Sequence, residues 1–222
     1  MHSAKLMAIS KPVGEEMNGL NPEECIIYMA RVSSPNSQVK LDTSIKLLRY
    51  LLDHAHYSPF QMVSATFEVT TTRAISRQLL RHRSLNFQEY SGRYAEMPYE
   101  MVEQECRLQD KKNRQSSIKT YDLEYCSDWE DMQADVWNKA IESYQEAIKR
   151  GIAKEVARSL LPEGLTESRL YVHGTIRDFM FYLKQRIGNG TQKEHELLAR
   201  SMASQLNPLF PNTLEALGIY VN

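Results

Sequence analysis

The densest group of chemically useful side chains in this 222-residue sequence lies between Arg73 and Arg93. The stretch holds five arginines against one acid, Glu89, although the whole chain has a formal net charge of -1. Such a local surplus predicts a bound anion, because arginine forks pair well with phosphate groups. Arg73 and Arg77 are four residues apart on one helical face, and we interpret them as solvated cations near a helix end.

The triplet Arg81-His82-Arg83 is different, because three consecutive residues point in different directions and can contact several groups around a helix end. Polar and flexible residues follow it, interleaved with aromatic ones: Asn86, Phe87, Gln88, Glu89, Tyr90, Ser91, Gly92 and Tyr94. Such a set can bind a planar heterocycle together with its phosphate. The spacing therefore predicts a nucleotide site.

Composition limits the alternatives. The near-neutral charge disfavours a general polyanion binder, and 42% hydrophobic residues exclude wholesale disorder. No apolar run approaches the ~18–20 residues that a membrane helix needs, and the first residues lack the apolar stretch of a signal peptide. Cys25, Cys106 and Cys126 lack CxxC spacing, so we expect reduced cysteines in an intracellular, soluble protein.

The elements that must position these residues begin with strands and end with helices. Alternation of apolar and polar residues over 63–70 predicts a half-buried strand, and residues 4–9 predict a shorter one. Helices are expected at about 22–31 after an Asn21 cap, at 42–54 with Asp42 or Thr43 as cap, and at 72–82.

The second half favours helices. The polar stretch 103–120 is expected to be an exposed insertion or mobile loop. A long amphipathic helix should follow Asp128 and end at Gly151, a shorter one should stop at Pro162, and 171–183 and 193–204 look helical around a break at 188–190. This order predicts an α+β fold, and we expect residues 1–222 to form one domain.

The triplet also carries a family resemblance. Arg81-His82-Arg83, seven further residues and Ser91 resemble the signature of the flavin-dependent thymidylate synthases. Distant segments are similar to that family in the same order: ARVS at 30–33, HAHYSPF at 54–60, AKEVARSLLP at 153–162 and GTIRDFMFYLKQRIGNGTQKEH at 174–195. KNRQSS at 112–117 and the GNGTQKEH stretch resemble the viral branch in particular.

The resemblance implies reductive methylation of dUMP to dTMP, with 5,10-methylenetetrahydrofolate as carbon donor, tightly bound FAD and NADPH as reductant. It implies an antiparallel sheet flanked by helices, with a helix-rich C-terminal half. It also implies a cytoplasmic homotetramer, in the host cytoplasm if the protein is viral, with active sites shared between subunits and no nucleic-acid or membrane partner.

The resemblance assigns the residues of a dUMP site as follows: Gln78, Leu79, Leu80, Arg81, Glu89, Tyr90, Ser91, Gly92, Arg93, Arg158 and Arg186. Arg186 and Ser91 are the expected catalytic residues. A fixed cation beside the pyrimidine N3 would favour its ionisation and activate C5 without a cysteine adduct. Ser91 is expected to orient and polarise the uracil, since no His/Asp relay is evident that would make it a nucleophile.

Contacts to FAD are implied for Ser33, Ser58, Arg81, His82, Arg83, Glu89, Thr175 and Arg177. The chain departs from the family pattern at Gln61, where many relatives have an acid or another polar group, at Phe181, where asparagine is common, and at Gly190, where some have histidine.

Three other hypotheses remain open on the residues alone. A thymidylate synthase with a cysteine nucleophile would need an activated thiol beside arginines. A non-catalytic nucleotide- or RNA-binding module could use the same arginines and tyrosines. His54 and His56 could suggest a metal pair, but two such histidines diverge on a helix and no third ligand has suitable spacing, so we predict no metal.

Overall fold

A four-stranded antiparallel sheet forms the centre of the computed structural model, which describes residues 2–38, 40, 44–188 and 190–220. Its strand order is β1-β2-β6-β3, with β1 at Ser3–Ile9, β2 at Ser64–Thr72, β6 at Glu167–Thr175 and β3 at Asn86–Glu89. In β2 the alternating residues Ala65, Phe67 and Val69 are at most 1% exposed. The strands predicted at 4–9 and 63–70 are therefore confirmed.

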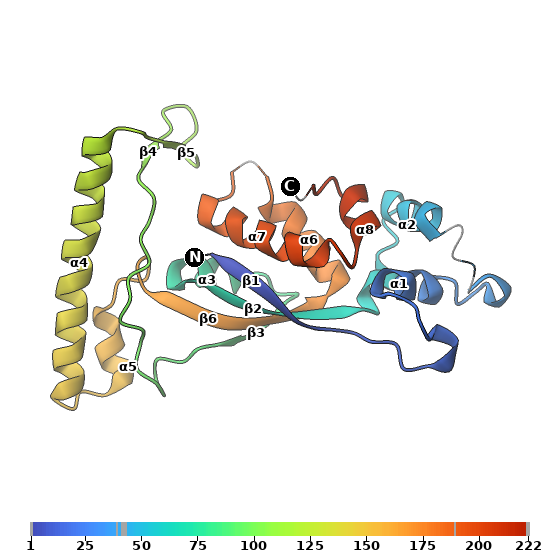
Figure 1. The fold of residues 1–222 in the computed structure, drawn as a ribbon, viewed down its shortest axis with the longest axis horizontal. Helices are drawn as coiled ribbons and strands as arrows, with labels where there is room; N and C mark the ends of the chain where they lie inside the picture. Colours follow the sequence, from blue (N-terminus) through green and yellow to red (C-terminus); the bar gives the residue numbers. More distant parts are fainter. Residues whose placement is uncertain (1, 39, 41–43, 189, 221–222) are drawn as a thin grey trace.

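Helices cover one face of this sheet (Figure 1). They are α3 (Arg73–Leu79), α6 (Ile176–Arg186), α7 (Lys193–Leu206) and α8 (Pro211–Ala216), with α1 (Pro22–Ala30) and α2 (Ser44–Asp53) beside them. The main core lies between these layers and includes Phe67, Phe179 and Leu198, all completely buried. On the opposite face, Arg169, Tyr171 and His173 of β6 are exposed.

Several helix starts follow local capping rules. Asn21 accepts a hydrogen bond from the Glu24 amide and Glu24 bonds back to the Asn21 amide, which with Pro22 in the first turn fixes the start of α1. Thr72 caps α3 through the Ile75 amide. The expected cap at Asp42 or Thr43 lies outside the described residues, and α2 is described from Ser44.

A 27-residue helix, α4 (Leu123–Lys149), stands apart from the sheet beside α5 (Lys154–Ala157), as Figure 1 shows. A second small core of Met97, Tyr144, Ala147, Ala157 and Leu161 joins the two helices to the loop after β3. The helix begins six residues before the predicted start at Trp129, because Asp122 accepts hydrogen bonds from the Glu124 and Tyr125 amides. Short 3₁₀ helices complete the chain: Glu15–Met17, Pro35–Ser37, Ser58–Gln61 and Arg158–Leu160.

One of the predictions was wrong. Residues 171–175 were expected to be helical, but they continue strand β6, and the helix α6 begins only at Ile176. The stretch 103–120, predicted to be an exposed insertion or mobile loop, contains a largely exposed hairpin of β4 (Arg107–Gln109) and β5 (Ser117–Lys119). An ion pair between Arg107 and Glu194 of α7 fixes this hairpin, which is why a stretch without apolar anchors is ordered.

The α+β fold with an antiparallel sheet and a helix-rich second half is confirmed. Among the described helices, none combines the length and the hydropathy required to cross a bilayer.

Candidate active site

The residues 81–83 lie in the turn that joins α3 to β3, and their side chains diverge as expected. Arg81 and Arg83 are exposed and form no ion pair with any described residue. His82 turns inward and packs edge-on against Tyr182 of α6, with ring centroids 4.9 Å apart. The two guanidinium groups are therefore available to an anionic ligand, whereas the imidazole belongs to the protein interior.

His82 and Arg186 form the first polar contact of the site. The Arg186 Nε donates a hydrogen bond to the His82 Nε2, at 3.0 Å. An imidazole nitrogen can accept only when it carries no proton, so His82 is neutral here. Burial, with Arg186 and Arg81 nearby, lowers the pKa of His82 to about 4. Since His82 uses only the Nε of Arg186, the terminal amino groups of this guanidinium are left to face a ligand.

His195 of α7 lies beside this pair, and sequence analysis assigned it no role. It is completely buried, and its Nδ1 donates to the Oε1 of Gln78 at 3.2 Å. Burial, followed by the charge of Arg186 and by His82, lowers the pKa of His195 to about 3. The ring orients Gln78, which was predicted to contact the nucleotide. His195 is the last residue of the GNGTQKEH stretch, within the segment similar to the family, and this position was the available signal.

A chain of hydrogen bonds continues from Gln78. Its Nε2 donates to the Oε1 of Gln192 at 2.7 Å, and Gln192 donates in turn to Glu194 at 2.8 Å. Glu194 pairs with Arg107 at 2.6 Å. Side chains of α3, α7 and the hairpin therefore hold one another in a fixed arrangement around Gln78.

Glu89, at the end of β3, is fixed by two serines. It accepts hydrogen bonds from the Ser76 hydroxyl of α3 and from the Ser168 hydroxyl of β6, the latter at 2.7 Å. Both donors are buried beneath it. One of its oxygens is thus used inside the protein, which orients the carboxylate for an external partner on the other oxygen.

The loop after Glu89 packs against α5. Arg93 pairs with Glu155 at 3.1 Å, and the Ser91 hydroxyl accepts weakly from the Arg93 amide at 3.4 Å. Gly92 is buried, and a Cβ on it would lie 3.2 Å from the Cδ of Arg158. The structure therefore brings together four residues predicted for the dUMP site, namely Ser91, Gly92, Arg93 and Arg158. Tyr90 is partly exposed, and its hydroxyl donates to the Glu96 carbonyl.

Of the residues predicted to contact FAD, Ser58, Thr175 and Arg177 lie at the end of the sheet where β2 begins and β6 ends. Thr175 caps α6 and donates to Asp178 at 2.6 Å, so its hydroxyl already has a structural role. Arg177 follows it and has a buried Nε without a hydrogen-bond partner. Ser58 and Ser33 are exposed, in the 3₁₀ turn before β2 and just after α1.

The three departures from the family pattern have structural consequences. The guanidinium of Arg177 lies over the ring of Phe181 in a cation–π contact, with its Cζ 5.5 Å from the ring centroid. Gln61 is exposed at the end of the same 3₁₀ turn as Ser58. Gly190 has φ = 87°, a left-handed conformation that favours glycine, and it faces Gln115 of the hairpin.

One chain does not bring all the predicted residues into contact. Gln78, His82 and Arg186 form one group, and Ser91, Gly92 and Arg158 another, and no hydrogen bond or ion pair joins the two groups among the described residues. Leu79 has its side chain completely buried in the core, so a nucleotide could touch only its backbone, whereas Leu80 is half-buried.

Other chemistries find little support in these side chains. Burial raises the pKa of the Cys25 thiol, and desolvation, with Cys126 beside it, raises that of Cys106, so neither is an activated nucleophile. His54 stacks on Tyr50, with ring centroids 4.0 Å apart, and its Nδ1 bonds the Tyr50 carbonyl. In the part of the chain that the structure describes, no three His, Cys, Asp or Glu side chains gather as metal ligands.

Comparison with known proteins adds a family to this geometry. The profile of the thymidylate synthase complementing protein family matches residues 16–212. The chain is 41% identical to a probable flavin-dependent thymidylate synthase of Paramecium bursaria Chlorella virus 1, over 97% of this chain and 98% of that one. It is 42% identical to the flavin-dependent thymidylate synthase of a Synechocystis strain, over 96% and 98%.

A solved structure agrees with these matches. A UMP/dUMP methylase from Streptomyces cacaoi, bound with 5-bromo-dUMP, superimposes with a TM-score of 0.85 at 27% identity, covering 99% of this chain and 96% of that one. The resemblance and the enzyme class predicted from the sequence are confirmed. With the signature triplet in the turn between α3 and β3 and relatives matched over nearly the whole chain, this chain belongs to the flavin-dependent thymidylate synthases, the thymidylate synthase complementing protein family.

Proposed function

We propose that this protein methylates dUMP to dTMP reductively, with 5,10-methylenetetrahydrofolate as carbon donor, FAD as cofactor and NADPH as reductant. The observation that carries the proposal is the fixed Arg186, held through its Nε by a neutral His82 so that its terminal amino groups are left for a ligand. The relatives' names and the bromo-dUMP bound to the Streptomyces enzyme support the same substrate and cofactor.

Arg186 acts on the pyrimidine by charge. A guanidinium held beside N3 stabilises the anion that forms when N3 loses its proton, and the negative charge makes C5 a better nucleophile. His82 supports this role because it accepts from Nε without adding a second positive charge. Gln78, oriented by His195, is placed to bind a heterocycle edge from the same side.

The second group binds the rest of the nucleotide. Arg158 and Arg93 supply positive charge for the phosphate, and Ser91 supplies a hydroxyl and a backbone amide in a loop that α5 holds in place. Glu89, oriented by two serines, accepts hydrogen bonds from a ligand hydroxyl or amide. Tyr90 and Gly92 give this loop its shape.

The residues present fit a flavin dinucleotide. Exposed Arg81 and Arg83 suit its pyrophosphate, and the buried Nε of Arg177 lacks the acceptor that a ligand would supply. We assign the flavin to these three residues together with Ser33, Ser58, His82, Glu89 and Thr175. When bound, FAD would carry the hydride and the one-carbon unit between the co-substrates and dUMP.

We also propose that the active unit is a homotetramer, with each active site completed by several subunits. Two observations support it. Among the described residues, no hydrogen bond or ion pair joins the two groups of site residues. The outer face of the sheet and much of α4 are also uncovered, with Met132 and Val136 more than half exposed. We assign the whole chain, residues 1–222, to one catalytic domain that works in the cytoplasm, where its three free cysteines stay reduced.

The test uses the purified protein with added FAD. We expect a flavin spectrum, and dTMP formed from dUMP only when both methylenetetrahydrofolate and NADPH are present. A colourless protein that binds oligonucleotides in a salt-sensitive way would replace the enzyme by a nucleic-acid-binding module.

Arg186→Lys tests the role of the fixed guanidinium. We expect it to keep the flavin and to lose methyl transfer by ~100-fold or more, because lysine lacks the planar fork. Arg150→Lys, at an exposed arginine paired with Glu146, is the matched control. Wild-type methyl transfer in Arg186→Lys would remove the assigned role.

A further inference from the structure

A groove of about 680 Å³ lies between the β4–β5 hairpin and the start of α7, and none of the residues assigned above to dUMP or FAD lines it. Its walls carry five cations and one acid: Arg107, Arg114, Lys119, Lys193, Arg200 and Glu196. Glu105 and Glu194 pair with some of these cations from behind the walls. Five cations against three carboxylates leave a surplus of positive charge, in a protein whose formal net charge is -1.

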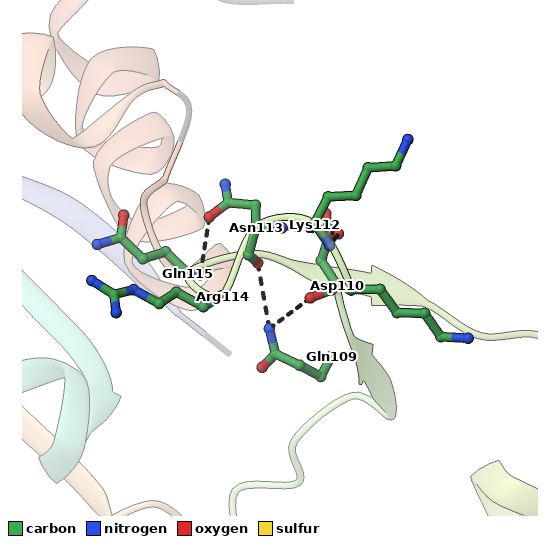
Figure 2. Close-up of a pocket in the computed structure, with 7 residues that line it drawn as sticks. Gln109, Asp110, Lys112, Asn113, Arg114 and Gln115 are labelled. Atoms are coloured by element: carbon green, nitrogen blue, oxygen red, sulfur yellow. Dashed lines mark hydrogen bonds between the residues drawn. The ribbon is translucent and has the colours of Figure 1, made fainter.

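The surplus is greatest at the hairpin tip. Arg114 has no ion pair with a described residue, and the neighbouring Lys111 and Lys112 have none either. Figure 2 shows Arg114 and Gln115 extending from the loop on the side opposite Lys112. A Cβ on Gly190 would lie 3.8 Å from the Oε1 of Gln115, so this side of the hairpin tip faces the loop before α7 across the groove.

The groove connects to the nucleotide side of the site. Gln192 lines it and also accepts the hydrogen bond from Gln78. Arg107, on the hairpin wall, holds the end of the same chain of hydrogen bonds through Glu194, and its own buried Nε has no partner. A ligand that reaches the site from this direction would therefore pass over the groove.

The arrangement of the cations suits carboxylates spread along a chain. Lys193, Lys119 and Arg107 all converge on one carboxylate of the protein itself, that of Glu105. The hydrogen bond from Lys193 is the main cause that lowers the pKa of Glu105 to about 2. Lys193 and Arg200 are seven residues apart on α7, about 10 Å along the helix, so their charges are spread along the groove.

We infer that this groove binds the carboxylates at the glutamate end of the folate co-substrate, above all a chain of γ-linked glutamates. The inference rests on the proposed function, which supplies the folate. Arg114 and Lys193 contribute the main attraction, because they bracket the groove from the hairpin and from α7. These two cations contribute to the binding of the folate and take no part in the chemistry at the pyrimidine.

The first test compares the KM for mono- and triglutamylated methylenetetrahydrofolate. Each added carboxylate at an exposed cation contributes up to about 1 kcal/mol, so the wild type should show a KM about 5- to 20-fold lower for the triglutamate. The double variant Arg114→Gln with Lys193→Gln should lose this preference. A control with the same loss of charge, Lys5→Gln with Lys46→Gln, changes exposed cations of β1 and α2 and should keep it.

The second test needs no turnover. Tri-γ-glutamate without a pterin is titrated into the FAD-loaded protein by calorimetry, with inorganic pyrophosphate as the comparison. We expect weak, salt-sensitive binding of tri-γ-glutamate that the double variant loses. Tighter binding of pyrophosphate, or a KM effect on NADPH in place of folate, would overturn the carboxylate assignment.

The two proposals fail in different ways. An enzyme that forms dTMP with equal KM values for both folates overturns the groove and leaves the proposed function standing. A protein that binds tri-γ-glutamate but forms no dTMP overturns the proposed function, and the groove then belongs to another reaction of an oligocarboxylate.

Discussion

Acid should destabilise this protein through His195, and the size of the effect follows from its burial. The ring is completely buried and its pKa is about 3, against 6.5 for a histidine in an unfolded chain. A lowered pKa means that the unfolded state binds the proton first as the pH falls. The stability contributed by the neutral ring is therefore complete above pH 6.5 and is lost as the pH falls from 6.5 towards 3.

A pH of 5 lies about 1.5 units below the pKa of the unfolded chain. Each unit corresponds to about 1.4 kcal/mol, so the free energy of unfolding falls by about 2 kcal/mol at this pH. This value depends little on the pKa in the folded protein, because any value well below 5 gives the same result. We therefore expect the advantage of the wild type over His195→Asn, in free energy of unfolding, to shrink by about 2 kcal/mol between pH 7.5 and pH 5. An asparagine amide can still donate to Gln78, and the cavity that it leaves costs the same at both pH values.

The assay is urea unfolding followed by far-ultraviolet circular dichroism at the two pH values. His173→Asn, at an exposed histidine on the open face of the sheet, is the control, and its difference from the wild type should stay within about 0.5 kcal/mol. A difference between wild type and His195→Asn that is the same at pH 7.5 and pH 5 would refute the assignment of a buried, neutral ring.

Two further substitutions test the supports of the site. Gly92→Ala should weaken dUMP binding about tenfold by calorimetry, because the new Cβ would lie 2.5 Å from the sulfur of a buried methionine and force the loop to shift; Gly164→Ala, which meets no atom within 4 Å, should not. Glu194→Gln should lower the free energy of unfolding by about 3 kcal/mol in urea, because it leaves the guanidinium of Arg107 enclosed with one carboxylate fewer. Glu196→Gln, at an exposed pair, should cost under about 1 kcal/mol, and equal losses in the two variants would contradict the buried pair.

The strand β6 shows why part of the fold could not be predicted. Its inward positions are Ser168, Leu170, Val172 and Gly174, so only two of the four are apolar side chains. The other two serve the site. Ser168 is needed to hold Glu89, and Gly174 leaves room for Leu85, whose Cδ2 would lie 2.5 Å from a Cβ there. Because Ser168 and Gly174 occupy inward positions, β6 lacks the alternation of apolar and polar residues from which β2 was predicted correctly.

The hairpin was missed for a different reason. Leu108 and Ile118 pair across it but remain about half exposed, so no apolar face marks it in the sequence. Its attachment is ionic, through Arg107 and Glu194, which are 87 residues apart and follow no local period. The same holds for the contact of His195 with Gln78. Pairs of this kind become visible only when the fold has brought the elements together.

An arginine that already forms an ion pair with an acidic side chain is less available to an anionic ligand than an unpaired one. The interpretation of Arg77 as a structural cation is supported by its pairing with Glu163 at 2.6 Å, and Arg93 pairs with Glu155. Both acids come from the segment around α5, far from the arginines in sequence. Arg73, Arg81 and Arg83 pair with no acid among the described residues, and of these three only Arg81 and Arg83 are exposed. An anion that binds Arg81 and Arg83 displaces no carboxylate, whereas one that binds Arg77 or Arg93 must compete with Glu163 or Glu155.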